Sequence, residues 1–239
     1  MKAKLIPLLI CILPSLSAHA TLVNNGNGLI YDDALNITWL QDANYANSSN
    51  YVTSNGRHVT SSDGQMSWDE AMEWAEQLNY AGFSEWRLPT VKPINGTNFV
   101  YDVSYEGNSD FGEHITSTQS ELSYMYFVNL NNSSLHDSNF GCGPGAQASC
   151  LDNTGMFNNL ESYNYWFGTE VEFDNDFAWS LNSQYGIQTP YDGKANEFHA
   201  WAVHQGDISN VPLPTAIWFF SSALIGLSQL KKDRILNKH

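Results

Sequence analysis

Residues 67–90 read Ser67-Trp-Asp-Glu-Ala-Met-Glu-Trp-Ala-Glu-Gln-Leu-Asn-Tyr-Ala-Gly-Phe-Ser-Glu-Trp-Arg-Leu-Pro-Thr90. The first half predicts an amphipathic helix, because Ser67 and Glu70 make a capping box and apolar residues then recur at helical spacing. Gly82 is the type of residue that ends such a helix. The acidic side chains fall on the opposite face, so we expect this helix to lie on a core, with the Trp-Arg-Leu-Pro-Thr segment packed beneath it.

The rest of the chain places short strand patterns between long polar loops. A second helix is predicted over 119–130, and the stretches 41–64 and 94–114 read as loops. Strands are predicted on both sides of a turn at 32–36 within 28–40, and over 163–171, 177–182 and 197–204. This order indicates an α+β fold, with two helices between strands near both ends of one domain.

The N-terminus predicts export. Lys2 and Lys4 precede an apolar stretch, and Ala18-His-Ala20 supplies the small residues that a signal peptidase reads. Residues 1–20 are therefore predicted to be a signal peptide, and the mature chain is predicted to begin at Thr21.

The C-terminal segment 211–239 combines a proline motif, an apolar run and a basic end. The motif is Val211, Pro212, Leu213 and Pro214, and no charge occurs from 215 to 230. A helix over this run, rising about 1.5 Å per residue, could just span a bilayer, with the basic end held in the cytoplasm. The segment resembles the PEP-CTERM sorting signals of Gram-negative bacteria. There a membrane protease, an exosortase, cuts at the motif and passes the protein from the periplasmic face of the inner membrane to the cell surface. A permanent transmembrane anchor is the alternative.

Residues 21–210 suit one domain with its own core, and they are strongly acidic. They hold 24 acidic residues against four basic ones, Arg57, Arg87, Lys92 and Lys194, so their formal charge is −20. Such a surface repels phosphate backbones, which argues against nucleic acid as a partner. It favours neutral or cationic ligands; the alternative is that the charge only keeps an exported protein soluble.

Two cysteines remain once the signal peptide is removed. Cys142 and Cys150 bracket a Gly/Pro-rich turn, and in an oxidising compartment this spacing favours a disulfide. A zinc site is the alternative, but His136 is the one histidine close in sequence.

Three blocks then occur in a fixed order. They are Asn27-Gly-Leu-Ile-Tyr-Asp32 with Thr38-Trp-Leu-Gln-Asp-Ala43, Met66-Ser-Trp-Asp-Glu-Ala71 with the Trp-Arg-Leu-Pro-Thr segment, and Tyr165-Trp-Phe-Gly-Thr169 with Trp179 and Ala200-Trp-Ala-Val203. In this order and at these intervals they resemble the Lcl C-terminal domain family, long listed as a domain of unknown function, over nearly all of 27–207. The resemblance implies a fold like that of C-type lectins and formylglycine-generating enzymes, with twisted antiparallel strands, two helices and long loops. It implies no reaction by itself.

The motif residues of this resemblance are types that build a scaffold. Arg87 is expected to make a fixed ion pair or to bind backbone carbonyls. The aromatic residues are expected to form a core, and for Tyr165, Trp166, Trp179 and Trp201 a sugar-stacking platform is the alternative. The full motif set is Trp39, Trp68, Trp86, Arg87, Leu88, Pro89, Trp166, Trp179 and Trp201.

An acidic run at 170–176 suggests a possible calcium site. As a single strand it would gather its carboxylates on one face, whereas as a hairpin it would place them in a solvated turn, and the family resemblance favours the hairpin. A calcium site could use Asp174 and Asp176, helped by Asp192, although no EF-hand spacing supports it.

No catalytic motif can be identified, since the histidines are scattered and no His-Glu-x-x-His or Gly-x-Ser-x-Gly occurs. We therefore predict an exported, surface-sorted, non-enzymatic binding module that recognises extracellular polysaccharide or a matrix partner and needs no cofactor other than calcium, if any. One alternative is a structural component of an extracellular matrix or biofilm without a small ligand. A second is an oxidase like formylglycine-generating enzymes, which use a cysteine pair with copper and oxygen, but Cys142 and Cys150 match no such motif.

Overall fold

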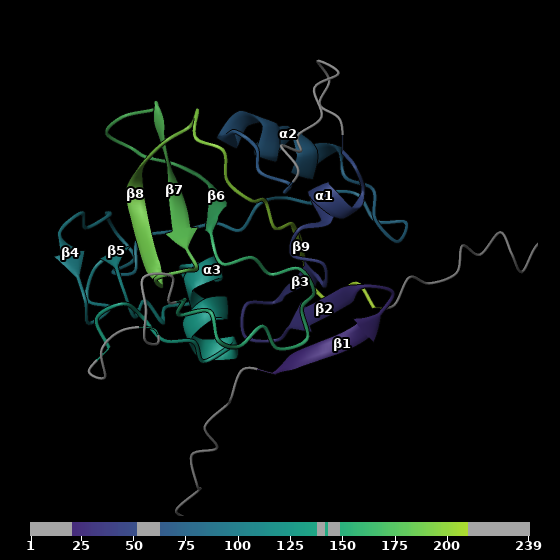
Figure 1. Ribbon diagram of the computed structural model, residues 1–239, viewed down its shortest axis with the longest axis horizontal. Coiled ribbons are helices and arrows are strands. Elements are labelled where there is room, and N and C mark those ends of the chain that lie inside the picture. Colours follow the sequence, from purple (N-terminus) through teal and green to yellow (C-terminus); the bar gives the residue numbers. More distant parts are fainter. Residues whose placement is uncertain (1–20, 52–62, 138–141, 143–148, 210–239) are drawn as a thin grey trace, which may run out of the picture.

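The computed structural model describes residues 21–51, 63–137, 142 and 149–209 (Figure 1). The predicted signal peptide at 1–20 and the predicted sorting segment at 211–239 lie outside the described residues. Within them the fold is mixed α+β, with two sheets and few helices. None of the helices in this part of the chain has the length and apolar composition needed to cross a bilayer.

The first sheet joins the two ends of the domain. Its strands are β1 (Leu22–Gly26), β2 (Leu29–Asp32), β3 (Ile37–Leu40) and β9 (Val203–Gln205), antiparallel in the order β1-β2-β3-β9. The strands predicted within 28–40 are thus confirmed. Buried Asp32 holds the turn between them, because its carboxylate accepts hydrogen bonds from the backbone N–H groups of Ala34 and Leu35, both at 3.1 Å.

The second sheet has the strand order β4-β5-β8-β7-β6. Its strands are β4 (Val103–Ser104), β5 (Phe111–Gly112), β6 (Asn164–Glu170), β7 (Phe177–Asn182) and β8 (Ile187–Gly193). The antiparallel pair of β6 and β7 confirms the strands predicted at 163–171 and 177–182. The pattern does not predict β8, because Pro190 interrupts it, and β4 and β5 are too short to leave a periodic signal.

The first predicted helix is α2 (Trp68–Gln77), which begins at the predicted capping box of Ser67 and Glu70. It ends before Gly82, because Leu78 already has an extended backbone. Tyr80 and Phe83 then close a tight turn through two backbone hydrogen bonds of 3.0 and 2.9 Å. Gly82 lies in that turn with a φ of 87°. The predicted loop 41–64 contains a further short helix, α1 (Tyr45–Ser48).

The second predicted helix consists of α3 (Glu121–Tyr124) followed by the π-helical η1 (Met125–Asn129). It lies between the two sheets (Figure 1) and bonds to both. Ser123 donates to the buried Gln188 of β8 at 2.6 Å, and Asn129 donates to Asp32 of β2 at 2.6 Å. The helix therefore joins the two sheets through hydrogen bonds, and its apolar side chains also pack in the core.

The strand predicted over 197–204 is wrong in extent, since only Val203–Gln205 forms β9. Phe198 instead pairs with Met66, through two backbone hydrogen bonds of 2.9 Å. His199 pairs with the start of β6, donating its N–H to Asn164 at 3.0 Å. The segment changes its partner every few residues, so it is extended and hydrogen-bonded without being one strand.

Tryptophans fill the interior. Four indole N–H groups donate to backbone carbonyls at 2.7 to 3.0 Å, so their burial leaves these donors satisfied. Tyr165 is buried too, at 1% exposure. No face of Tyr165, Trp166, Trp179 or Trp201 is open for sugar stacking, which removes the platform alternative for these residues. None of the seven tryptophans among the described residues is more than 8% exposed. They are Trp39, Trp68, Trp74, Trp86, Trp166, Trp179 and Trp201.

A clamp between Arg87 and Glu121 connects the motif segment to α3. The Arg87 guanidinium donates two hydrogen bonds to the Glu121 carboxylate, at 2.7 and 2.8 Å, and a third to the carbonyl of Leu88 at 3.0 Å. Glu121 also accepts the backbone N–H of Thr90 at 2.6 Å. The backbone of Arg87 bonds to that of Val203 in β9 in both directions. The ion pair expected for Arg87 is thus present, and it joins three segments distant in sequence.

We predict that Arg87→Ala lowers the free energy of unfolding by about 2 to 3 kcal/mol, because it leaves the nearly buried Glu121 carboxylate without its cation. Arg87→Lys keeps the charge but loses the two-pronged geometry, so we expect an intermediate loss. Lys92→Ala, at an exposed cation five residues away, should change the value by less than about 0.5 kcal/mol. Urea unfolding of the three variants measures this, and equal losses for Arg87→Ala and Lys92→Ala would contradict the clamp.

Candidate functional site

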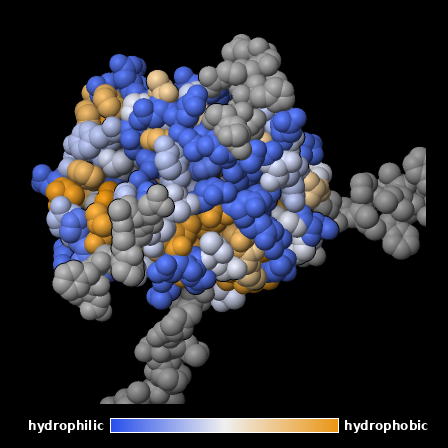
Figure 2. Space-filling model, in the orientation of Figure 1, coloured by the Kyte–Doolittle hydropathy of each residue, from blue (hydrophilic) through white to orange (hydrophobic). Residues whose placement is uncertain are grey.

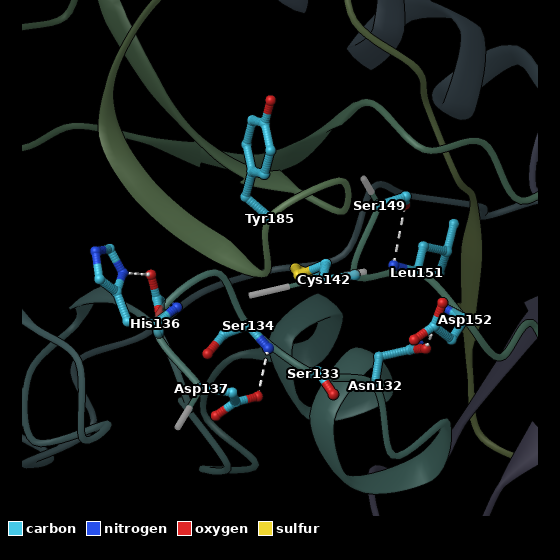
Figure 3. The surroundings of a disulfide bond; sticks show 12 residues. Asn132, Ser133, Ser134, His136, Asp137, Cys142, Ser149, Leu151, Asp152 and Tyr185 are labelled. Atoms are coloured by element: carbon cyan, nitrogen blue, oxygen red, sulfur yellow. Dashed lines mark hydrogen bonds and ion pairs between the residues drawn. A yellow bond between two sulfur atoms is a disulfide. The ribbon is translucent and has the colours of Figure 1, made fainter. Parts of the chain in front are cut away.

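Cys142 and Cys150 lie at disulfide distance, with Cα atoms 4.4 Å apart and both side chains buried (Figure 3). The backbone N–H of Cys150 donates to Gln184 at 2.8 Å, which attaches the loop to the turn between β7 and β8. Nδ1 of His136 lies 2.6 Å from Oε1 of the buried Glu113. Across the described ranges, no three His, Cys, Asp or Glu side chains are arranged to hold a metal ion.

Ser134, His114 and Asp137 lie together beside this loop, and their residue types raise the question of a nucleophile. Nε2 of His114 is 2.7 Å from Asp137, and Nδ1 is 3.0 Å from the carbonyl of Tyr105. Both ring nitrogens therefore have partners other than the serine. The hydroxyl of Ser134 lies 3.4 Å from each nitrogen, which is not the directed contact between a nucleophile and its base. These contacts join Asp137, His114 and the carbonyl of Tyr105 to one another.

The acidic run forms a turn between β6 and β7, as the hairpin interpretation expects. The N–H of Phe177 donates to Asp174 at 3.2 Å and that of Asp176 to the Asp174 carboxylate at 3.1 Å. Asp192 accepts the Ser180 hydroxyl instead, and burial raises the pKa of its carboxyl group. Asp174, Asp176 and Asp192 form no group of three metal-ligating side chains among the described residues, so the calcium hypothesis gains no support from this geometry.

Four aromatic side chains form a chain of neighbouring rings on the second sheet, which we call the aromatic strip. Its members are Phe111 of β5, Tyr191 of β8, Phe173 of the β6–β7 turn and Tyr101, just before β4. Successive ring centroids are 5.5, 6.1 and 4.8 Å apart in that order. Phe173 is 55% exposed and Tyr191 50%. Phe111 and Tyr101 are partly buried, so the strip runs from half-buried to exposed rings, and exposed apolar rings of this kind are candidates for an interaction site.

The buried core fixes the inner end of the aromatic strip. The ring of Tyr101 is stacked on that of Trp179 at 5.9 Å, and Phe99 packs against the same indole at 5.0 Å. Trp179 itself is fully buried in β7. Figure 2 shows apolar residues interrupting the hydrophilic surface on the side where β4 and β5 lie. The strip is thus the exposed margin of the aromatic core.

Sequence reasoning does not find the aromatic strip. Phe173 is read as part of an acidic run, and Tyr191 belongs to a strand that Pro190 conceals. A usable signal is the position of Phe173, an aromatic residue at a hairpin turn, where no core is available to bury it. The partner of such a residue could not be named without the pairing of β7 with β8.

Carboxylates border the aromatic strip. Glu172 and Asp174 flank Phe173 along the chain. Lys194, close by in sequence, is held by Glu170, and its Nζ lies 4.3 Å from the ring centroid of Trp68. The strip therefore combines apolar faces with a negative margin, which suits a neutral or cationic ligand.

One histidine of the described residues, His199, is buried. His199 is 2% exposed, and its ring lies 5.2 Å from that of Tyr165 and 5.9 Å from that of Tyr163. Burial lowers the pKa of His199 to about 4, so the ring is neutral at physiological pH.

The sequence model of the Lcl C-terminal domain family matches residues 28–204, which include both sheets except β1 and the end of β9. No curated protein and no solved structure matches the chain.

We predict that His199 makes the domain less stable in acid. Between pH 6.5 and about 4 the unfolded chain binds a proton at His199 that the folded chain does not, so stability falls as the pH is lowered, by roughly 3 kcal/mol from this residue. His199→Gln removes that contribution. The difference in unfolding free energy between wild type and variant should therefore shrink from pH 7 to pH 4, and a constant difference would contradict the burial of a neutral ring.

Proposed function

Because the chain belongs to the Lcl C-terminal domain family, we propose that it is an exported, non-enzymatic binding module that recognises extracellular polysaccharide. The observation that carries this proposal is the aromatic strip. Sugar rings present apolar C–H faces that pack on aromatic faces, and the neighbouring exposed rings of Phe173 and Tyr191 offer two such contacts to one chain. The strip belongs to a sheet whose inner side is fixed by the tryptophan core, so little ordering is needed on binding.

We further propose that the fold is of the C-type-lectin-like kind that the family resemblance implies. Twisted antiparallel strands, the two helices α2 and α3–η1, and the long irregular segments between them support it. In such a fold loops carry recognition while the sheets hold them, and Tyr101 and Phe173 both lie outside the strands.

The ligand should be neutral or cationic. The negative margin at Glu172 and Asp174, within a domain of formal charge −20, disfavours an anionic polymer unless cations bridge the two. The exported protein should bind a neutral β-glucan or chitosan and should not bind alginate in excess chelator. Binding of alginate under those conditions would contradict the proposal, and no binding of any glycan would favour a purely structural matrix role.

We predict that Phe173→Ala and Tyr191→Ala each weaken the binding of the neutral or cationic polymer by about fivefold to tenfold, the equivalent of about 1 to 1.4 kcal/mol per ring. Val23→Ala is the matched control, since it removes an exposed apolar side chain (43% exposed) from the other sheet. Affinity is measured by isothermal titration calorimetry. If the two strip variants bind as tightly as the control, the strip is not the glycan surface.

We also propose the processing that the chain ends indicate. Signal peptidase would cleave after Ala20, and the backbone N of Thr21 lies 2.7 Å from Oδ1 of Asp33, so cleavage would place a new ammonium group beside a carboxylate. An exosortase would then cut near Val211 to Pro214 and release the domain from the periplasmic face to the cell surface. Until that step, the C-terminal apolar segment would hold the protein in the membrane.

N-terminal sequencing of the exported protein is expected to give Thr21. Mass spectrometry of the surface protein should find no peptide that extends through Lys231 in a host with an exosortase, and should find it in a host without one. Recovery of that peptide from the surface of the first host would instead establish a permanent anchor.

A further inference from the structure

A second surface feature lies apart from the aromatic strip: a polar hollow of about 360 Å³. Three chain segments form its walls, namely the start of α1 with Asn44, residues 63–65 before α2, and residues 161–163 before β6. His199 contributes from the extended segment that joins the two sheets. The lining side chains are amides, carboxylates, a hydroxyl group, a tyrosine and a histidine, so aliphatic side chains do not line it.

The walls are fixed before any ligand binds. Nδ2 of Asn44 donates to the carbonyl of Asp63 at 2.8 Å, which joins two of the segments. His199 is hydrogen-bonded through its backbone to both Asn164 and Trp166 of β6, at 3.0 Å each. Asn44 and His199 are 3% and 2% exposed. A volume of this size with preformed walls falls in the range of small-molecule sites.

Two buried polar atoms of these walls lack a hydrogen-bond partner among the described residues. They are Oδ1 of Asn44 and Nδ1 of His199. Buried polar atoms in folded proteins nearly always have partners, so these two atoms call for an explanation, and a polar ligand in the hollow is one. With the carboxylates of Asp63 and Glu161 alongside, acceptor groups predominate in the hollow.

From this lining we propose that the hollow binds a single neutral sugar unit. A sugar presents many O–H donors to acceptor groups, and its apolar face can pack on Tyr163, which is 40% exposed and lines the hollow. A bare cation fits less well, because the described residues contain no group of three metal-ligating side chains. The inference deepens the proposed function, on which it rests, by giving the module a pocket for one sugar residue in addition to a surface for a chain.

The test uses the exported protein and free monosaccharides, namely glucose, mannose, galactose and N-acetylglucosamine, observed by saturation-transfer NMR and titration. We expect at least one to bind to the wild-type protein. Tyr163→Ala and Glu161→Gln change exposed residues at the hollow and so should leave the fold intact; each should weaken that binding at least tenfold. Val23→Ala, at an exposed residue of β1 outside both the hollow and the aromatic strip, is the matched control and should leave monosaccharide binding unchanged.

Two outcomes overturn the inference: no monosaccharide binds the wild type, or binding persists in both hollow variants with unchanged affinity. Polymer binding keeps this result separate from the proposed function. If Tyr191→Ala loses the polymer while no monosaccharide binds the hollow, the hollow inference alone fails. If the wild type binds monosaccharide but no polymer, the hollow stands and the strip proposal fails.

Discussion

The charge pair of Arg87 and Glu121 is the constraint on which the arrangement of the domain depends. A carboxylate in the first turn of α3 is tolerable in the interior only because a guanidinium and a backbone N–H satisfy its oxygens. That requirement fixes α3 against the motif segment, and the same segment bonds to β9 through Arg87 and to β6 through the carbonyl of Pro89. One ion pair thereby sets the position of the helix that lies between both sheets.

The negative charge of the domain is little offset at its surface, because most of the few Lys and Arg side chains that the structure describes are paired with carboxylates. Arg87 and Lys194 are both used inside the fold, the first by Glu121 and the second by Glu170 and the ring of Trp68. Of the basic residues that the structure describes, Lys92 alone is exposed. Among the charged groups exposed on the described residues, negative ones therefore strongly predominate, and the aromatic strip lies in a negative field.

Elements could be predicted from the sequence where the local residue pattern agrees with the contacts made in the fold. The capping box at Ser67 and the hairpins at 28–40 and 163–182 depend on residues close together in the sequence, so the sequence is enough to predict them. The prediction of one strand over 197–204 was wrong because its alternating apolar residues resemble a strand. The segment instead pairs first with Met66, then with Tyr165 and last with β3. The aromatic strip could not be predicted, since Phe173 and Tyr191 meet only through the pairing of β7 with β8.

The pairing of β3 with β9 brings the two ends of the domain into one sheet, and Asn25 near the start even bonds to Asp207 near the end, at 2.8 Å. This has a mechanical consequence. A pull applied at residues 21 and 209 would load the first sheet, in which the pairing of β9 with β3 has the fewest residue pairs, three. The second sheet, with the aromatic strip, lies outside that line of force, so tension on the domain would leave the shape of the strip unchanged.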